Sequence, residues 1–175
     1  MCTKNAVTLF FILVIVFAVL TACQPIGNDP SMKAQEYIGL DENIDRNKLK
    51  ELVGVDPART EWCAAFVNAV LDMQDIPGSE SVSNYPLMAR SFLEWGKKVE
   101  GEPQKGDIVI FPRGDRGWQG HVGFFIRDTG KAWVILGGNQ DNTVNYSLYD
   151  PKKVIAIRRH IFENNGVQTE KNIIE

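Results

Sequence analysis

The sequence predicts an α+β fold in which N-terminal helices pack on an antiparallel β-sheet. Helical periodicity dominates the residues before Gly101, and short β-rich runs separated by turn residues dominate those after it. Helices in one block and strands in another favour α+β over an alternating arrangement. With 175 residues, 44% of them hydrophobic, the chain is long enough for one domain with its own core.

Helices are expected over roughly 32–40, 45–53, from Thr60 to the residue before Pro77, and 86–97. The third is the strongest, because Thr60 can cap its first turn. Its apolar side chains share one face at helical spacing, namely Cys63, Phe66, Val67 and Val70. That face must be buried, so we expect the helix to pack on the sheet with the thiol at its start, pointing towards the strands.

Strands are expected over 107–111, 121–126, 132–136 and 154–157. Asp107 follows Gly106, where a carboxylate is expected to fix a turn at the strand entry rather than to act as a catalytic acid. The polar stretch 161–175 is expected to be a loosely ordered tail.

The N-terminus resembles a bacterial lipoprotein signal. An apolar run over residues 7–20 follows the single charge of Lys4 and is shorter than the ~20 residues of a usual membrane span. It leads through the small residues Thr21 and Ala22 to Cys23, the cysteine that such signals present for acylation. The alternative is an uncleaved membrane anchor, which also puts the rest of the chain outside the cytoplasm.

These features divide the chain into a signal peptide at 1–22, a lipidated N-terminus and tether at 23–31, and a domain at 32–160. Lipid on Cys23 makes the membrane a partner and the protein an exported lipoprotein. Gln24 rather than Asp follows that cysteine, which by analogy with lipoprotein sorting indicates the outer membrane, facing the periplasm, in a Gram-negative host.

Several classes of partner are not expected. The net charge of −3 leaves no large basic field for nucleic acid. Cys63 and His121 supply only two metal ligands, with no close-spaced second pair to complete a zinc site. No phosphate-binding or dinucleotide motif is present, so neither a metal nor a cofactor is expected. The protein is expected to be a monomer.

Cys63 is the only thiol of the mature chain, because Cys2 leaves with the signal and Cys23 carries lipid. A lone cysteine in an exported protein is either a buried hydrophobe or a reactive thiol. The lone cysteine by itself favours the buried hydrophobe, whereas a position at a helix start would stabilise a thiolate, because the helix end is positive.

His121 is the candidate base, at the start of a predicted strand with glycines on both sides that leave room for another element. The other reading is a strand-end histidine bonded to the backbone, and His160 near the tail is expected at the surface. Two strands joined by a short turn would bring Asn139 level with His121, where its amide oxygen could accept from the imidazole. Strand alternation would put Gln140 on the opposite face, and a simple turn is the other explanation of these residues.

Short blocks in this order resemble the CHAP and NlpC-like superfamily of papain-like peptidoglycan amidases and endopeptidases. The blocks are Trp62-Cys63-Ala64-Ala65-Phe66, Gly106-Asp107-Ile108-Val109-Ile110-Phe111, Gly120-His121-Val122-Gly123-Phe124 and Gly137-Gly138-Asn139-Gln140. The similarity runs from about Ala34 to Arg159 and is greatest to a compact phage and bacterial group that shares the last block.

The resemblance implies a cysteine peptidase or amidase that cuts amide bonds of peptidoglycan stem peptides or the muramoyl–alanine link. It implies Cys63 as nucleophile, His121 as base and Asn139 as the third member, with Trp62 and Gln140 as secondary contacts. The lipid anchor departs from soluble lysins and suits local wall remodelling or a prophage-derived function. The alternatives are an inactive wall-binding lipoprotein on the same fold, or another thiol reaction such as acyl transfer or deamidation.

Overall fold

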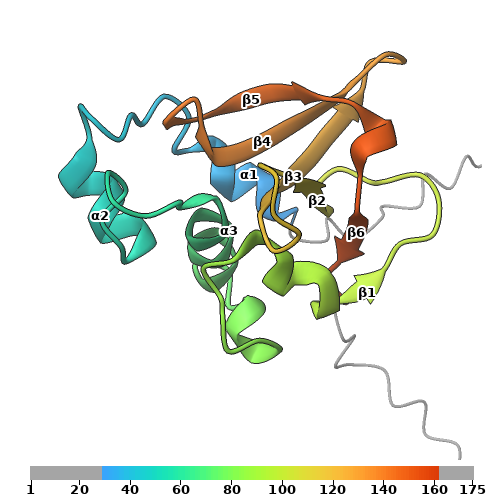
Figure 1. Ribbon diagram of the computed structural model, residues 1–175, viewed down its shortest axis with the longest axis horizontal. Helices are drawn as coiled ribbons and strands as arrows, with labels where there is room; N and C mark the ends of the chain where they lie inside the picture. The colour runs from blue at the N-terminus through green and yellow to red at the C-terminus, as the bar shows by residue number, and fades with distance from the viewer. Residues whose placement is uncertain (1–28, 162–175) are drawn as a thin grey trace, which may run out of the picture.

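The computed structural model describes residues 29–161, which form helices on one side of a single sheet (Figure 1). The helices are α1 (Pro30–Gln35), α2 (Arg46–Val53), α3 (Cys63–Asp72) and the short 3₁₀-helices η1 (Ser79–Ser81), η2 (Ala89–Glu94) and η3 (Pro151–Lys153). The expected signal peptide, most of the tether and all but the first residue of the polar tail lie outside the described residues. No helix within 29–161 is long and apolar enough to cross a bilayer.

The sheet has six strands in the order β1-β6-β2-β3-β4-β5, and every neighbouring pair is antiparallel. The strands are β1 (Lys97–Lys98), β2 (Ile108–Pro112), β3 (Gly120–Asp128), β4 (Trp133–Gln140), β5 (Thr143–Tyr149) and β6 (Ala156–Arg159). The α+β prediction is confirmed. β1 and β5 were not anticipated. Both are edge strands; β1 has only two residues, and in β5 the polar residues Thr143, Asn145 and Ser147 interrupt the hydrophobic run.

α3 is the buried helix of the domain. Its residues from Cys63 to Val67 are all buried, and it packs on β3 and β4, as expected, while α2 covers its outer side. Phe66 from α3, Phe124 from β3 and Leu136 from β4 are fully buried in the same apolar cluster. Each such side chain contributes roughly 1.5–3 kcal/mol when removed from water. The position of α3 on the sheet is therefore strongly specified.

Two helix predictions need correction. α3 begins at Cys63 after Trp62, not at a Thr60 cap, and no side chain caps it. The Trp62 indole, just before the helix, is fully buried and donates to Glu42 Oε2 at 3.0 Å.

The segment 86–97 is not an α-helix but contains η2. Ala89, Phe92 and Trp95 are all buried, and their spacing of three residues matches the 3₁₀ period rather than the α-helical one.

Asp107 fixes the entry to β2, as the sequence indicated. Gly106 has φ +90°, and Asp107 Oδ2 accepts the Gln104 N–H at 2.7 Å. The same carboxylate is buried and binds the Arg159 guanidinium with two bonds of 2.6 and 2.7 Å. Asp107 thus ties the start of β2 to the end of β6 and takes no part in the site described below.

Candidate active site

Cys63 is the first residue of α3, and its thiol is turned towards β3. Only 2% of the residue is exposed. The backbone N–H of Val122 in β3 is close enough to the sulfur to lower the pKa of the thiol, and Val122 directly follows His121. The packing of α3 therefore brings the thiol to the part of the sheet that carries the imidazole.

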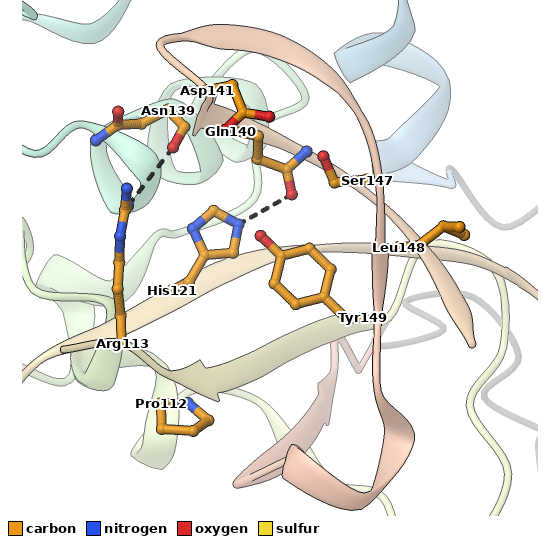
Figure 2. Close-up of a pocket in the computed structure, with 9 residues that line it drawn as sticks. All are labelled: Pro112, Arg113, His121, Asn139, Gln140, Asp141, Ser147, Leu148 and Tyr149. Atoms are coloured by element: carbon orange, nitrogen blue, oxygen red, sulfur yellow. Dashed lines mark hydrogen bonds between the residues drawn. The ribbon is translucent and has the colours of Figure 1, made fainter. Parts of the chain in front are cut away.

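His121 is held between aromatic and amide groups. Its ring stacks on Tyr149 with centroids 5.3 Å apart and an interplanar angle of 4°, and Tyr149 in turn stacks on Phe111. Its Nε2 lies 3.1 Å from Gln140 Oε1 (Figure 2). The Gln140 amide is itself oriented, because its Nε2 donates to the Asn145 carbonyl at 2.6 Å.

This arrangement decides which imidazole nitrogen can act as a base. An amide oxygen only accepts, so the contact with Gln140 places the proton of the neutral ring on His121 Nε2. Nδ1 is then the unprotonated nitrogen and can take a proton from a thiol. Cys63 and His121 are not hydrogen-bonded to each other in the part of the chain that the structure describes.

The expected partner of His121 was wrong: Gln140, not Asn139, contacts the ring. Asn139 has φ 57°, and the β4–β5 register shifts between Gly137 and Gln140, so simple strand alternation fails here. The Asn139 side chain points away from the imidazole in Figure 2 and donates to Glu61 Oε2 at 2.7 Å.

A signal for this break was present in the sequence. Asp141 and Asn142 follow Asn139, and all three have positive φ, a conformation that Asn and Asp adopt more readily than other non-glycine residues. These residues indicate that regular alternation of side chains does not continue to the end of β4.

Gly137 and Gly138 face opposite sides of β4, Gly138 towards α3 and Gly137 towards His121 of β3. A Cβ on Gly138 would lie 2.4 Å from the Trp62 ring, in the direction of α3. A Cβ on Gly137 would lie 3.4 Å from His121 Nε2. Trp62, expected as a secondary site contact, therefore seats α3 against the strand and is absent from the pocket walls described next.

Two adjoining pockets contain the thiol and the imidazole. One of about 480 Å³ is lined by His121, Gln140 and Tyr149, and one of about 380 Å³ is lined by Cys63 together with apolar side chains that include Trp118. Arg113, in the loop after β2, lines both pockets. Neither Arg113 nor Tyr149 was anticipated, because a single arginine in a turn and a tyrosine at the end of an unassigned strand carry no sequence signal.

Burial sets the resting protonation of the pair. It raises the pKa of the Cys63 thiol, against the opposing effects of the Val122 N–H and the Arg113 charge. It lowers the pKa of His121 to about 4, with Arg113 acting in the same direction and the Gln140 contact opposing it. Near neutral pH the site therefore holds a thiol beside a neutral imidazole, which is the form that can accept a proton.

The same burial predicts a pH-dependent stability. The folded His121 has a pKa of about 4, whereas the unfolded one is near 6.5. Above pH 6.5 both states are neutral, and as the pH falls towards 4 only the unfolded state takes up a proton. We expect the free energy of unfolding to fall by up to about 3 kcal/mol across this window through His121 alone.

Urea unfolding at pH 7 and pH 4.5, with His121→Gln as the control, measures this effect. The wild-type protein should lose more stability than the variant between the two pH values, since all other titrating groups are shared. An equal loss in both proteins would show that His121 is not buried in its neutral form.

The pattern of a helix-borne thiol and a strand-borne imidazole agrees with the comparison to known families. The model of the CHAP domain matches residues 55–139, a segment that contains Cys63 and His121. This chain carries a CHAP domain. Among curated proteins, none matches the chain.

CHAP domains are typically cysteine-dependent hydrolases, and the match implies a peptidoglycan amidase or endopeptidase that works outside the cytoplasm. The match lies within the domain expected at 32–160. Within residues 29–161, no group of three or more His, Cys, Asp or Glu side chains is arranged to hold a metal ion.

Proposed function

We propose that residues 32–160 form a thiol-dependent amidase or endopeptidase that cuts amide bonds of peptidoglycan stem peptides. Cys63 is the nucleophile and His121 is the base. The observation that carries the proposal is the placement of Cys63 at the start of α3, where the backbone amide of Val122, next to His121, lowers the thiol pKa, inside the CHAP domain.

The reaction begins when His121 Nδ1 takes the thiol proton and the Cys63 sulfur attacks the carbonyl carbon of the substrate amide. The backbone N–H of Cys63 at the helix start is available as one donor to the resulting oxyanion. The C–N bond then breaks, and the imidazolium gives its proton to the departing amine. Water, deprotonated by His121, hydrolyses the thioester and returns the free thiol.

Gln140 takes the positioning role first expected of Asn139. Its amide oxygen accepts from Nε2 of His121 and so keeps Nδ1 free, and the bond from its own Nε2 to Asn145 holds the amide in place. Asn139 does not contact His121, and its side-chain amide instead donates to the carboxylate of Glu61.

Digestion of purified peptidoglycan tests the function. The full chain in detergent should release soluble fragments, and Cys63→Ala should release none, because the variant has no nucleophile. Mass analysis of the fragments names the bond that is cut. Equal release by both proteins would reject thiol catalysis, and no release by either would favour the inactive wall-binding domain.

We also propose that lipid on Cys23 tethers the domain to a membrane, on the evidence of the apolar run and the small residues before that cysteine. When the two proteins are expressed in bacteria fed radiolabelled palmitate, the wild type should carry the label and Cys23→Ser should not. Equal labelling of the two would place the lipid elsewhere, and label in neither would leave the uncleaved anchor as the explanation.

A further inference from the structure

Arg113 lies at the junction of the pocket that holds the thiol and the pocket that holds the imidazole. It is the only lysine or arginine among the residues lining either one. Its side chain runs past the imidazole of His121 to the backbone oxygen of Asn139, as Figure 2 shows. A substrate amide that reaches both reacting groups must therefore pass this guanidinium.

The guanidinium already holds a carboxylate of this chain. Arg113 Nη1 lies 3.1 Å from Glu61 Oε2, and the Glu61 side chain is 74% exposed. The same Glu61 oxygen also accepts the Asn139 amide at 2.7 Å, so Glu61 keeps a partner when it leaves Arg113. Ion pairs with this much exposure contribute little to stability, so an incoming anion can replace Glu61 at Arg113. The planar fork of an arginine can hold a carboxylate with two parallel bonds.

We infer that Arg113 binds a carboxylate of the substrate next to the amide that is cut, displacing Glu61, and so selects stem peptides in which that carboxylate is free. Peptidoglycan stem peptides carry such groups, for example on their γ-linked glutamate, and some walls convert them to carboxamides. A carboxamide has no charge to offer the guanidinium. This inference rests on the proposed function, because it names the substrate class of the same site.

The test uses two synthetic stem peptides that contain the bond identified by mass analysis and differ only in the nearest side group, carboxylate or carboxamide. For the full chain in detergent, we expect kcat/KM for the carboxylate peptide to be about tenfold higher or more. Arg113→Gln should bring this ratio close to one. Arg116→Gln, an exposed arginine of the same loop outside both pockets, should leave it unchanged.

Glu61→Gln should act in the opposite direction. With the competing carboxylate removed, KM for the carboxylate peptide should fall, and KM for the carboxamide peptide should stay the same. The Arg113 and Glu61 charges also influence the thiol pKa. That influence changes both peptides alike, so the ratio isolates the contact with the substrate.

Calorimetric binding to Cys63→Ala, which cannot turn over, separates this inference from the proposed function. Cys63→Ala should bind the carboxylate peptide more tightly than the carboxamide peptide, and the double variant Cys63→Ala with Arg113→Gln should lose this preference. That result supports the inference even if the wild type cuts neither peptide. Equal binding and equal cleavage of the two peptides by the wild type, or a ratio that survives Arg113→Gln, would overturn it.

Discussion

His121→Ala is expected to abolish measurable peptidoglycan digestion, a loss of at least about 10³-fold. The buried thiol has a raised pKa, so little thiolate exists at neutral pH without a base beside it. Neutral His121, with Nδ1 unprotonated, is the base that the site offers. Release of soluble fragments by the full chain in detergent is the measurement.

Two further variants, Gln140→Ala and Asn139→Ala, test whether the loss of activity follows contact with the imidazole. Gln140→Ala leaves the imidazole present but unoriented and is expected to cost about 10- to 100-fold, a typical loss when a group that orients an active histidine is removed. Asn139→Ala should only weaken activity, since its side chain does not contact the ring. Thermal melting of each variant checks that the fold survives. Full activity in His121→Ala would remove the catalytic assignment, and a larger loss in Asn139→Ala than in Gln140→Ala would restore Asn139 as the partner.

The sequence was sufficient for the fold class and for the placement of Cys63 at the start of a helix and His121 at the start of a strand. The apolar face that follows Cys63 and the β-rich run that follows His121 are local patterns, and each predicts an element whose first residues include a proposed catalytic residue. The turn at Asp107 was equally local, because it depends on a glycine with positive φ and an adjacent carboxylate.

What the sequence did not reveal depends on contacts between distant segments. The residue before α3, Trp62, is held by a bond to Glu42, twenty residues earlier. Gln140 reaches His121 because of a register shift between β4 and β5, and β5 had not been anticipated. Arg113 lies over the site through its contacts with Glu61 and the Asn139 backbone. Propensity and periodicity do not encode the contacts of Trp62 and Arg113, and the Asn and Asp residues around Gln140 signal the end of regular alternation without identifying the partner of His121.

Gly138→Val is expected to destabilise the domain by about 4 kcal/mol, above the usual cost of overpacking. The reason is that the new Cβ would lie 2.4 Å from a Trp62 ring carbon and 2.7 Å from Phe66 Cβ, and both belong to fully buried side chains that cannot move aside. Urea unfolding of the chain that begins at residue 24 measures the change. Gly117→Val is the matched control, because nothing lies within 4 Å of a Cβ at that exposed position, and it should change stability by no more than about 0.5 kcal/mol.

A side chain at Gly138 should also affect activity, because it changes the position of α3 on the sheet. If α3 withdraws from β4 to make room, the sulfur of Cys63 leaves the Val122 N–H beside His121. Gly138→Ala, with a smaller side chain, should then lose activity more steeply than stability. A variant that keeps wild-type digestion and wild-type unfolding would show that α3 does not need this close approach. In that case Gly138 would not be required to bring the thiol towards the imidazole.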